Sequence, residues 1–261
     1  MRELLATARN LAEEAGDYIR QSASRLGKVE YKGRADLVTD VDRKAEEIIV
    51  GGIRRAYPDH AVLAEESGEN GGRSEFRWVV DPIDGTTNFV HGYPFFCVSI
   101  AVQHRQETVA AVVHNPVLGE IFAALKGHGA RLNGNPIAVS PTAELSGALV
   151  ATGFPYQLGE HWHHSMELFK AFYLNCHGVR RDGAAALDLC YVAAGRFDGF
   201  WEYDLQPWDV AAGLLIVNEA GGRTSDFQER PSGIFDRQVL ASNGRIHGDM
   251  LEVIRSRVQS P

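Results

Sequence analysis

Cysteine is scarce in this sequence, which has three, Cys97, Cys176 and Cys190, in 261 residues. An odd number without paired spacing argues against a disulfide framework and favours reduced thiols, as in a cytosol. No apolar run approaches the roughly 20 residues needed to span a bilayer. The first twenty residues carry acids throughout and lack the apolar core of a signal peptide. These absences predict a soluble cytoplasmic protein without a membrane partner.

Positive charge is also in deficit. The chain has 26 Lys and Arg against 34 Asp and Glu, a formal net charge of −8. Such a field repels nucleic acid and acidic membrane surfaces, so the overall charge disfavours both as partners. The same balance suits a protein that gathers carboxylates around a cation. The 23% charged content is ordinary for a globular chain with a buried core, and the length allows one large domain or two modest ones.

Common catalytic motifs are missing as well. No P-loop is present, which excludes nucleotide hydrolysis of that type, and no Ser-His-Asp or Cys-His arrangement stands out. The histidine-rich stretch at residues 161–169, HWHHSMELF, lacks the H-E-x-x-H order of a zinc helix and is interpreted as a polar helix face. A covalent phosphoenzyme therefore has no convincing nucleophile.

The first half of the chain alternates between helical and strand-like patterns. Apolar residues at helical spacing predict helices over 2–25 and 40–57, the second ended by Pro58. Residues 60–66 and 76–81 are short apolar runs that end in acids, which predicts buried strands carrying carboxylates at their ends. Successive antiparallel strands are predicted within 95–103, 107–116 and 119–126. The pair Asn133-Gly134 then predicts a tight hairpin turn.

The second half mixes strands and helices. Strands are predicted within 148–154, 197–202 and 238–243, and helices within 161–174, 183–195, 207–222 and at the C-terminus. This alternation predicts a mixed sheet flanked by helices. We expect a single unit with two lobes, a metal-binding α+β half at about 1–140 and a mixed α/β half at 141–261, with the site between them.

Acidic residues gather at the boundaries of these apolar elements. They are Glu65 and Glu66, Asp81, Asp84, and Asp209. Carboxylates that share one site repel each other unless protons or cations neutralise them. Oxygen ligands without paired histidines or cysteines select hard cations, which favours Mg²⁺ or Mn²⁺ over zinc. Mg²⁺ bound by a few carboxylates, water and phosphate oxygens is typical of phosphoryl transfer.

The stretch DPIDGTTNF adds backbone features to this set. The carbonyl of Ile83 could be a further ligand, and Gly85 lets the backbone approach a ligand closely. Thr86 and Thr87 open a short helical turn whose free N–H groups can receive a phosphate. Each feature alone has an ordinary explanation as a turn, a helix-dipole contact or a solvated strand end. Their coincidence favours a metal and phosphate site.

The stretches DPIDGTTNFVHGYPFFCVSIAV and WDVAAGLLIVNEAGG resemble the two signature motifs of the inositol monophosphatase family. The stretches DLVTDVD, LAEESGE and RRDGAAALDLCYVAAGRFDGFWE follow the family's order, so the resemblance covers nearly the whole chain and is nearest to the bacterial branch. It implies a layered α-β-α-β-α sandwich of the inositol monophosphatase and fructose-1,6-bisphosphatase type. It also implies hydrolysis of a phosphate monoester, above all myo-inositol 1-phosphate, with two or three Mg²⁺ per site or Mn²⁺ as a substitute. A homodimer and lithium sensitivity follow from the resemblance alone.

The resemblance also assigns roles to individual positions. Glu65, Asp81 and the Ile83 carbonyl resemble ligands of a first metal, and Asp81, Asp84 and Asp209 those of a second. Asp42 matches an acid near a weaker third metal. The residues that would orient and deprotonate the attacking water are Thr86 with Glu65 or Asp42. The substrate-binding positions are Asp84, Gly85, Thr86, Gly183, Ala184, Ala185, Glu202 and Asp209.

Two departures leave the preferred alcohol open. Gln206 stands where some animal members have histidine, and Asp182 stands where many relatives have a neutral residue. An acid at position 182 is unexpected near a phosphate unless it points away or pairs with Arg180 or Arg181. The same chemistry on histidinol phosphate, fructose 1,6-bisphosphate or 3′-phosphoadenosine 5′-phosphate is one alternative. Another is a non-enzymatic role as a protein partner in an RNA transcription complex.

Overall fold

The computed structural model describes residues 1–22, 29–31 and 37–258. Helices account for much of these residues. The helices are α1 (Arg2–Ser22), α2 (Asp40–Ala56), α3 (Thr86–His91), α4 (Glu160–Asn175), α5 (Ala185–Ala193), α6 (Pro207–Glu219) and α7 (His247–Val258), with a 3₁₀ turn at Leu145–Gly147. The predicted helices are confirmed, except that residues 23–25 lie outside the described residues. In the described part of the chain, no helix is both long and apolar enough to cross a membrane.

The strands form a small ribbon and two larger sheets. They are β1 (Val29–Tyr31), β2 (Leu37–Thr39), β3 (Ala61–Ala64), β4 (Gly68–Asn70), β5 (Phe76–Asp84), β6 (Cys97–His104), β7 (Glu107–Asn115), β8 (Glu120–Leu125), β9 (Ala130–Leu132), β10 (Asn135–Pro136), β11 (Leu149–Thr152), β12 (Gly178–Arg180), β13 (Gly199–Tyr203), β14 (Arg223–Ser225) and β15 (Gln238–Ser242). Sequence patterns missed β1, β2, β4, β12 and β14, because three residues are too few to show an alternation.

The larger sheet has the strand order β10-β9-β8-β7-β6-β5-β3-β4. Its neighbours are antiparallel, except that β3 and β5 are parallel. The predicted antiparallel run from β6 to β8 is therefore confirmed. So is the hairpin after β9, where Asn133 and Gly134 have φ of 49° and 83°, as a tight primed turn requires.

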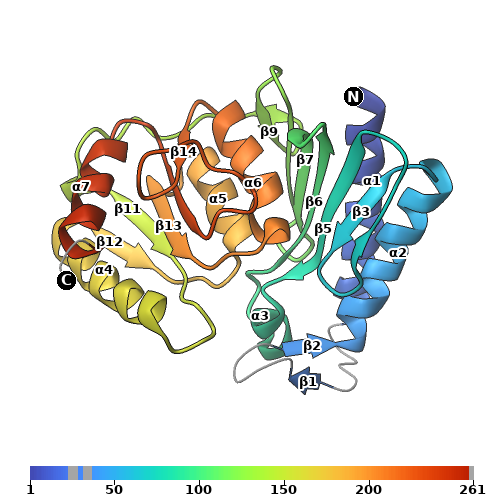
Figure 1. Cartoon of the computed structure of the whole chain (residues 1–261), viewed down its shortest axis with the longest axis horizontal. Coiled ribbons are helices and arrows are strands. Elements are labelled where there is room, and N and C mark those ends of the chain that lie inside the picture. The colour runs from blue at the N-terminus through green and yellow to red at the C-terminus, as the bar shows by residue number, and fades with distance from the viewer. Residues whose placement is uncertain (23–28, 32–36, 259–261) are drawn as a thin grey trace.

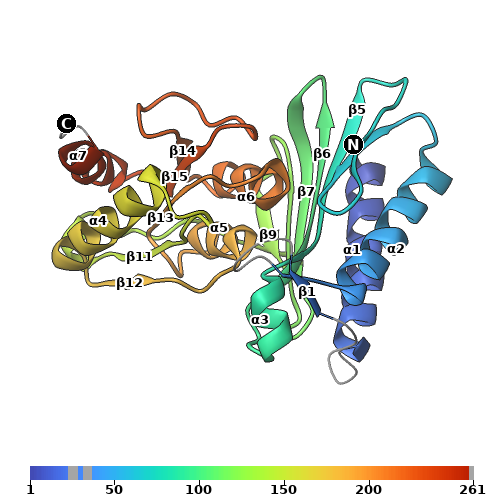
Figure 2. The ribbon, with the colours of Figure 1, turned by 60° about the horizontal axis from the view of Figure 1, so that its bottom comes forward.

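The smaller sheet has the order β12-β11-β13-β15-β14. Strand β11 is parallel to β12 and β13, whereas β15 is antiparallel to β13 and β14, which confirms the predicted mixed sheet. Helices α1 and α2 cover the outer face of the larger sheet, and α4 and α7 cover the outer face of the smaller one (Figures 1 and 2).

Helices α5 and α6 lie between the two sheets and complete the α-β-α-β-α layering (Figure 1). Because they are covered on both sides, they are apolar all round, with every residue from Val210 to Val217 buried. Helix α6 comes from the second half of the chain but packs on β6 and β7 of the first. The two-lobe boundary near residue 140 stays a prediction, since the middle helix layer belongs to both sheets.

A buried histidine ties the last helix to the smaller sheet. In His247 at the start of α7, Nε2 lies 2.9 Å from Ser225 Oγ of β14, and Nδ1 lies 2.9 Å from Ser242 Oγ of β15. Burial, helped by the positive charge of Arg223, lowers the pKa of His247 from 6.5 to about 4. The imidazole is therefore neutral in the folded protein at neutral pH.

We expect this histidine to make folding acid-sensitive. Between pH 6.5 and about 4 the unfolded chain binds a proton on His247 that the folded protein excludes. The free energy of unfolding therefore decreases as the pH is lowered through that window. The loss is on the order of 1–3 kcal/mol. Urea unfolding of wild type and His247→Gln at about pH 7.5 and about pH 4.5 measures it. The variant has no proton to bind there and should lose less; equal losses in both proteins would contradict the assignment.

Candidate active site

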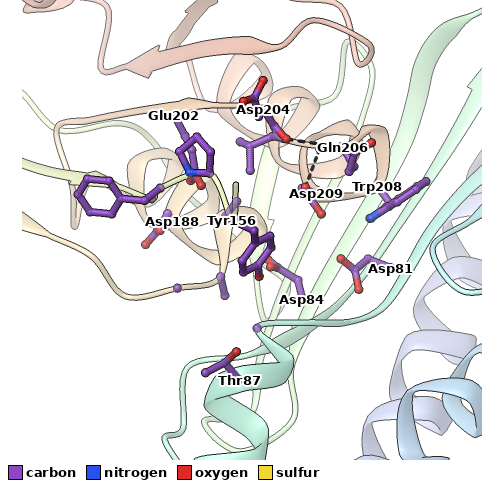
Figure 3. Close-up of a pocket in the computed structure, with 18 of the residues that line it drawn as sticks. Asp81, Asp84, Thr87, Tyr156, Asp188, Glu202, Asp204, Gln206, Trp208 and Asp209 are labelled. Carbon is purple, nitrogen blue, oxygen red and sulfur yellow. Dashed lines mark hydrogen bonds between the residues drawn. The ribbon is translucent and has the colours of Figure 1, made fainter. Parts of the chain in front are cut away.

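A cavity of about 650 Å³ opens between the larger sheet and the segments that lead into α5 and α6 (Figure 3). Among the residues that the structure describes, eight acidic side chains and two arginines line it, and no histidine or cysteine does. The acids are Glu65, Glu66, Asp81, Asp84, Asp188, Glu202, Asp204 and Asp209, and the arginines are Arg181 and Arg237. So large an excess of negative charge repels an anionic ligand unless cations enter with it.

A β-bulge in β5 places two of these acids on one face of the sheet. Asp81 pairs with Ser99 and Asp84 pairs with Cys97, so three steps along β5 match two steps along β6. In a regular strand, residues three apart point to opposite faces. The extra residue cancels that alternation, and Pro82 is tolerated there because a bulged position needs no ladder N–H. Both carboxylates therefore face α5 and α6.

The two carboxylates of β5 are held by main-chain donors. Asp84 Oδ2 accepts a hydrogen bond of 2.7 Å from the Ala186 N–H at the start of α5, and Asp81 Oδ1 accepts one of 2.9 Å from the Ile83 N–H. Burial raises the pKa of Asp84 to about 7, and the negative charge of Glu65 adds to the shift. Burial also raises the pKa of Asp81 well above its ordinary value, and the charges of Glu65, Asp84 and Asp209 add to the shift.

Asp209 enters the site from the first turn of α6. Pro207 occupies the start of that helix, and Asp209 Oδ2 accepts a 2.7 Å hydrogen bond from the backbone N–H of Gln206, which precedes the helix. The dashed lines in Figure 3 mark the hydrogen bonds of Gln206, and Asp209 lies across the opening from Asp84. The helix start thus fixes the carboxylate by ordinary capping geometry.

Glu65 follows β3 directly, in a turn that a buried acid stabilises. Because β3 is parallel to β5, with Ala64 opposite Val80, Glu65 reaches the same edge of the sheet as Asp81. Glu46 of α2 accepts hydrogen bonds from the backbone N–H groups of Glu66 (2.8 Å) and Ser67 (2.9 Å). Sequence reasoning missed Glu46, which lies among apolar residues of α2 and carries no motif.

Thr86, the first residue of α3, is linked to Asp42. Its hydroxyl lies 2.9 Å from Asp42 Oδ1 and 3.1 Å from the Ile83 carbonyl oxygen. Asp42 Oδ2 accepts hydrogen bonds from the N–H and the hydroxyl of Thr39, at 2.8 and 2.5 Å, in the capping box of α2. Asp42 does not line the cavity itself but stands directly behind Thr86.

Two glycines allow the chain to pass close to the cavity. Gly85 has φ of 93°, and a Cβ there would lie 3.1 Å from the Phe95 carbonyl oxygen and 3.2 Å from Ala184 Cβ. A Cβ on Gly153 would overlap the Glu202 carboxylate. Burial raises the pKa of Glu202 to about 8, against the opposing charge of Arg181.

The structure brings almost all the predicted site residues together. Those that line the cavity are Glu65, Asp81, Ile83, Asp84, Gly85, Thr86, Gly183, Ala184, Ala185, Glu202 and Asp209. Sequence reasoning missed Asp188 and the wall formed by residues 152–157. A signal existed for Asp188, since an acid inside an otherwise apolar helix is unusual.

Two sequence features turn out to lie beside the site rather than in it. Asp182 does not line the cavity and makes a side-chain hydrogen bond with Tyr93; burial raises its pKa, and the charges of Arg180 and Arg181 oppose the shift. His161 of the histidine-rich stretch bonds to Asp204 at 2.9 Å and stacks on Tyr203. Both groups are therefore engaged within the protein.

The donor set suits hard divalent cations. The acidic side chains that converge on the cavity from β5, and those of Glu65 and Asp209, offer carboxylate oxygens. The burial and neighbouring charges that raise the pKa of Asp81 and Asp84 are effects that bound cations would offset. Among residues 1–22, 29–31 and 37–258, however, no three Asp, Glu, His or Cys side chains form a closed ligand set. The assignment of a metal site therefore rests on charge, burial and ligand chemistry rather than on ligand distances.

Comparisons with known proteins agree over the length of the chain. The model of the inositol monophosphatase family matches residues 1–259. Nus factor SuhB of Vibrio cholerae is 43% identical, covering 100% of this chain and 98% of its own length. The chloroplastic phosphatase IMPL1 of Arabidopsis thaliana is 43% identical, over 96% of this chain and 70% of its own length. The solved structure of inositol monophosphatase from Anabaena has a TM-score of 0.87 at 36% identity, covering 98% and 96% of the two chains.

We expect removal of one buried charge to stabilise the metal-free protein. The folded pKa of Asp84 is about 7, above its ordinary 3.8, so the folded state holds a proton that the unfolded state has lost between those pH values. The free energy of unfolding therefore falls as pH rises through this window, on the order of 1–3 kcal/mol. Asp84→Asn keeps an oxygen for the Ala186 N–H and abolishes the loss.

Thermal unfolding in excess EDTA from about pH 4 to about pH 8 measures the effect. Asp249→Asn is the control, because Asp249 is an exposed acid in the first turn of α7. If Asp84→Asn lost stability with rising pH as steeply as the control, the buried carboxylates would not repel each other as described.

Proposed function

The chain belongs to the inositol monophosphatase family, and we propose that it hydrolyses phosphate monoesters, with myo-inositol 1-phosphate as substrate and Mg²⁺ as cofactor. The observation that carries the proposal is the bulge that turns Asp81 and Asp84 to one face, where Glu65 and Asp209 share their cavity. A structural protein has no use for four converging acids at three element ends.

The carboxylates divide into two overlapping ligand groups. Glu65, Asp81 and the Ile83 carbonyl would hold one cation, and Asp81, Asp84 and Asp209 a second, with Asp42 beside a weaker third position. When bound, the cations would neutralise the phosphate, make water a better nucleophile and stabilise charge on the leaving oxygen. The family relation and the purely oxygen donor set support this assignment.

The chain's own groups would then handle the attacking water and its proton. The Thr86 hydroxyl orients the water, and Asp42, which Thr86 contacts, or Glu65 accepts its proton as the water oxygen bonds to phosphorus and the ester P–O bond breaks. Burial raises the pKa of Asp42, which favours its accepting a proton. The alcohol oxygen leaves on the side of Asp209 and takes up a proton. No covalent intermediate on the chain is required.

The alcohol would occupy the end of the cavity formed by Gly183, Ala184, Ala185 and Glu202. The cavity is large enough for esters other than inositol 1-phosphate, and Phe154 and Tyr156 line its rim. Aromatic side chains at the rim offer a stacking surface, so 3′-phosphoadenosine 5′-phosphate belongs among the substrates to test, beside histidinol phosphate and fructose 1,6-bisphosphate.

A second role is favoured by the relatives named Nus factor SuhB, one of them 43% identical over the full chain. We infer a protein contact within a transcription complex, since a net charge of −8 disfavours direct RNA binding. Such a contact need not involve the cavity. Binding that survives Asp209→Asn would separate it from catalysis.

We expect Mg²⁺-dependent phosphate release, fastest from inositol 1-phosphate among the esters named above and β-glycerophosphate. Asp84→Asn and Asp209→Asn should each lower kcat by about 10³-fold or more, because each removes a cation ligand that stabilises the transition state. Chelation by EDTA should abolish release and added Mg²⁺ should restore it. Asp249→Asn, which changes the same charge on the surface, should keep wild-type rates.

Near-normal turnover in either site variant would show that the two-cation assignment is wrong. Release from no ester would leave the protein-contact role as the function. The homodimer and the lithium sensitivity stay predictions of the family resemblance, and the same assay with added Li⁺ tests the second.

A further inference from the structure

Asp188 is a buried acid that neither the fold nor the proposed mechanism uses. It lies in the first turns of α5, within the apolar run AALDLCYVA, and its side chain is 1% exposed. Its Oδ1 has no hydrogen-bond partner in the described part of the chain. A polar atom buried without a partner destabilises the folded state, so its retention calls for a function.

A helix-dipole role does not account for this burial. An acid in the first turn of a helix gains from the dipole when it is exposed, as Asp249 is at the start of α7. Asp188 instead lines the cavity, on the side away from Asp81 and beside Glu202 (Figure 3). The Asp188 side chain therefore borders the space in which a ligand would sit.

The neighbours of Asp188 suit an alcohol rather than a phosphate or a cation. Burial raises the pKa of Asp188, the charges of Asp182, Glu202 and Asp84 add to the shift, and Arg181 opposes it. The shift favours the neutral carboxyl group, which both donates and accepts hydrogen bonds. A hydroxyl group also does both, so the two are complementary, whereas a phosphate would meet the surrounding acids.

We propose that Asp188 is a specificity-determining residue that hydrogen-bonds a ring hydroxyl of a polyol phosphate, beside the hydroxyl-binding position at Glu202. The inference takes its substrate from the proposed function. It extends that function to a residue that is not among those proposed to bind the metals or the phosphate. It predicts that the site selects alcohols rich in hydroxyl groups, because an apolar alcohol would offer the Asp188 carboxyl group no hydrogen-bond partner.

The test pairs two variants with two esters. In Asp188→Leu the side chain has a similar size but makes no hydrogen bond, whereas in Asp188→Asn it keeps a donor and an acceptor. The esters are myo-inositol 1-phosphate and cyclohexyl phosphate, which share the ring and the phosphate but differ in the hydroxyls. Asp249→Leu is the matched control, since it removes an acid from the first turn of another helix, on the surface.

We expect Asp188→Leu to lower kcat/KM for inositol 1-phosphate by about tenfold or more, mainly through KM, and to leave cyclohexyl phosphate within about twofold. Asp188→Asn should restore most of the preference, and Asp249→Leu should not change it. Equal losses on both esters would overturn the proposal, because Asp188 would then act on the shared phosphate or on the fold. An unchanged preference in Asp188→Leu would overturn it as well.

Binding of the free alcohol separates this inference from the proposed function. Titration calorimetry of myo-inositol and of cyclohexanol, with Mg²⁺ and inorganic phosphate present, should show a preference for myo-inositol that Asp188→Leu loses and Asp188→Asn keeps. If wild type hydrolysed neither ester yet showed this pattern, the phosphatase proposal would fail and the role of Asp188 would stand. If wild type hydrolysed both esters without any preference for the polyol, in rate or in binding, the phosphatase proposal would stand and the role of Asp188 would fail.

Discussion

Mutual repulsion among buried carboxylates is the constraint on which this structure depends. Asp81, Asp84, Asp209 and Glu65 share one cavity. Burial raises the pKa of Asp81 and Asp84; the charges of Glu65, Asp84 and Asp209 add to the shift at Asp81, and that of Glu65 to the shift at Asp84. Left to themselves such groups would turn toward solvent. The fold holds them inward with main-chain N–H groups from Ile83, Ala186 and Gln206, each of which is fixed by secondary structure. A cation bound among these acids would offset part of the energy that their burial costs the folded protein.

The layering places these donors where the acids need them. Helices α5 and α6 lie between the sheets (Figure 2). Residues at the start of each helix line the cavity, so each brings a helix N-terminus toward the carboxylates of β5. The positive end of a helix dipole favours negative charge nearby. The hydrogen bond from Ala186 to Asp84 also links the larger sheet to the middle layer. Packing and charge placement are therefore served by the same two helices, which is why their apolar character extends all round.

The sequence predicted those elements in which a pattern extends over many residues. The long helices, the antiparallel run of β6 to β8 and the acids at element ends could all be predicted, because periodicity and motif both act locally. Three-residue strands such as β4 and β12 could not, since tertiary pairing alone defines them. The bulge was hidden for a related reason: the letters DPID show a proline between acids, but only the pairing with Ser99 and Cys97 shows that both acids face one way. Glu46 and Asp188 were missed because their roles depend on partners distant in sequence.

The acids of the cavity differ in what surrounds them, and that difference separates their tasks. Asp81 and Asp84 receive main-chain hydrogen bonds and repel each other across a space that cations can fill. Glu202 and Asp188 feel the opposing charge of Arg181 and line the cavity together with Gly183 and Ala184. The first pair is suited to binding charge and the second to binding hydroxyls. A single acidic cavity can thus hold the two ends of a phosphate ester in a fixed direction, with the phosphate at β5 and the alcohol at α5. That direction aims the scissile bond at the oxygen that Thr86 and Asp42 would orient.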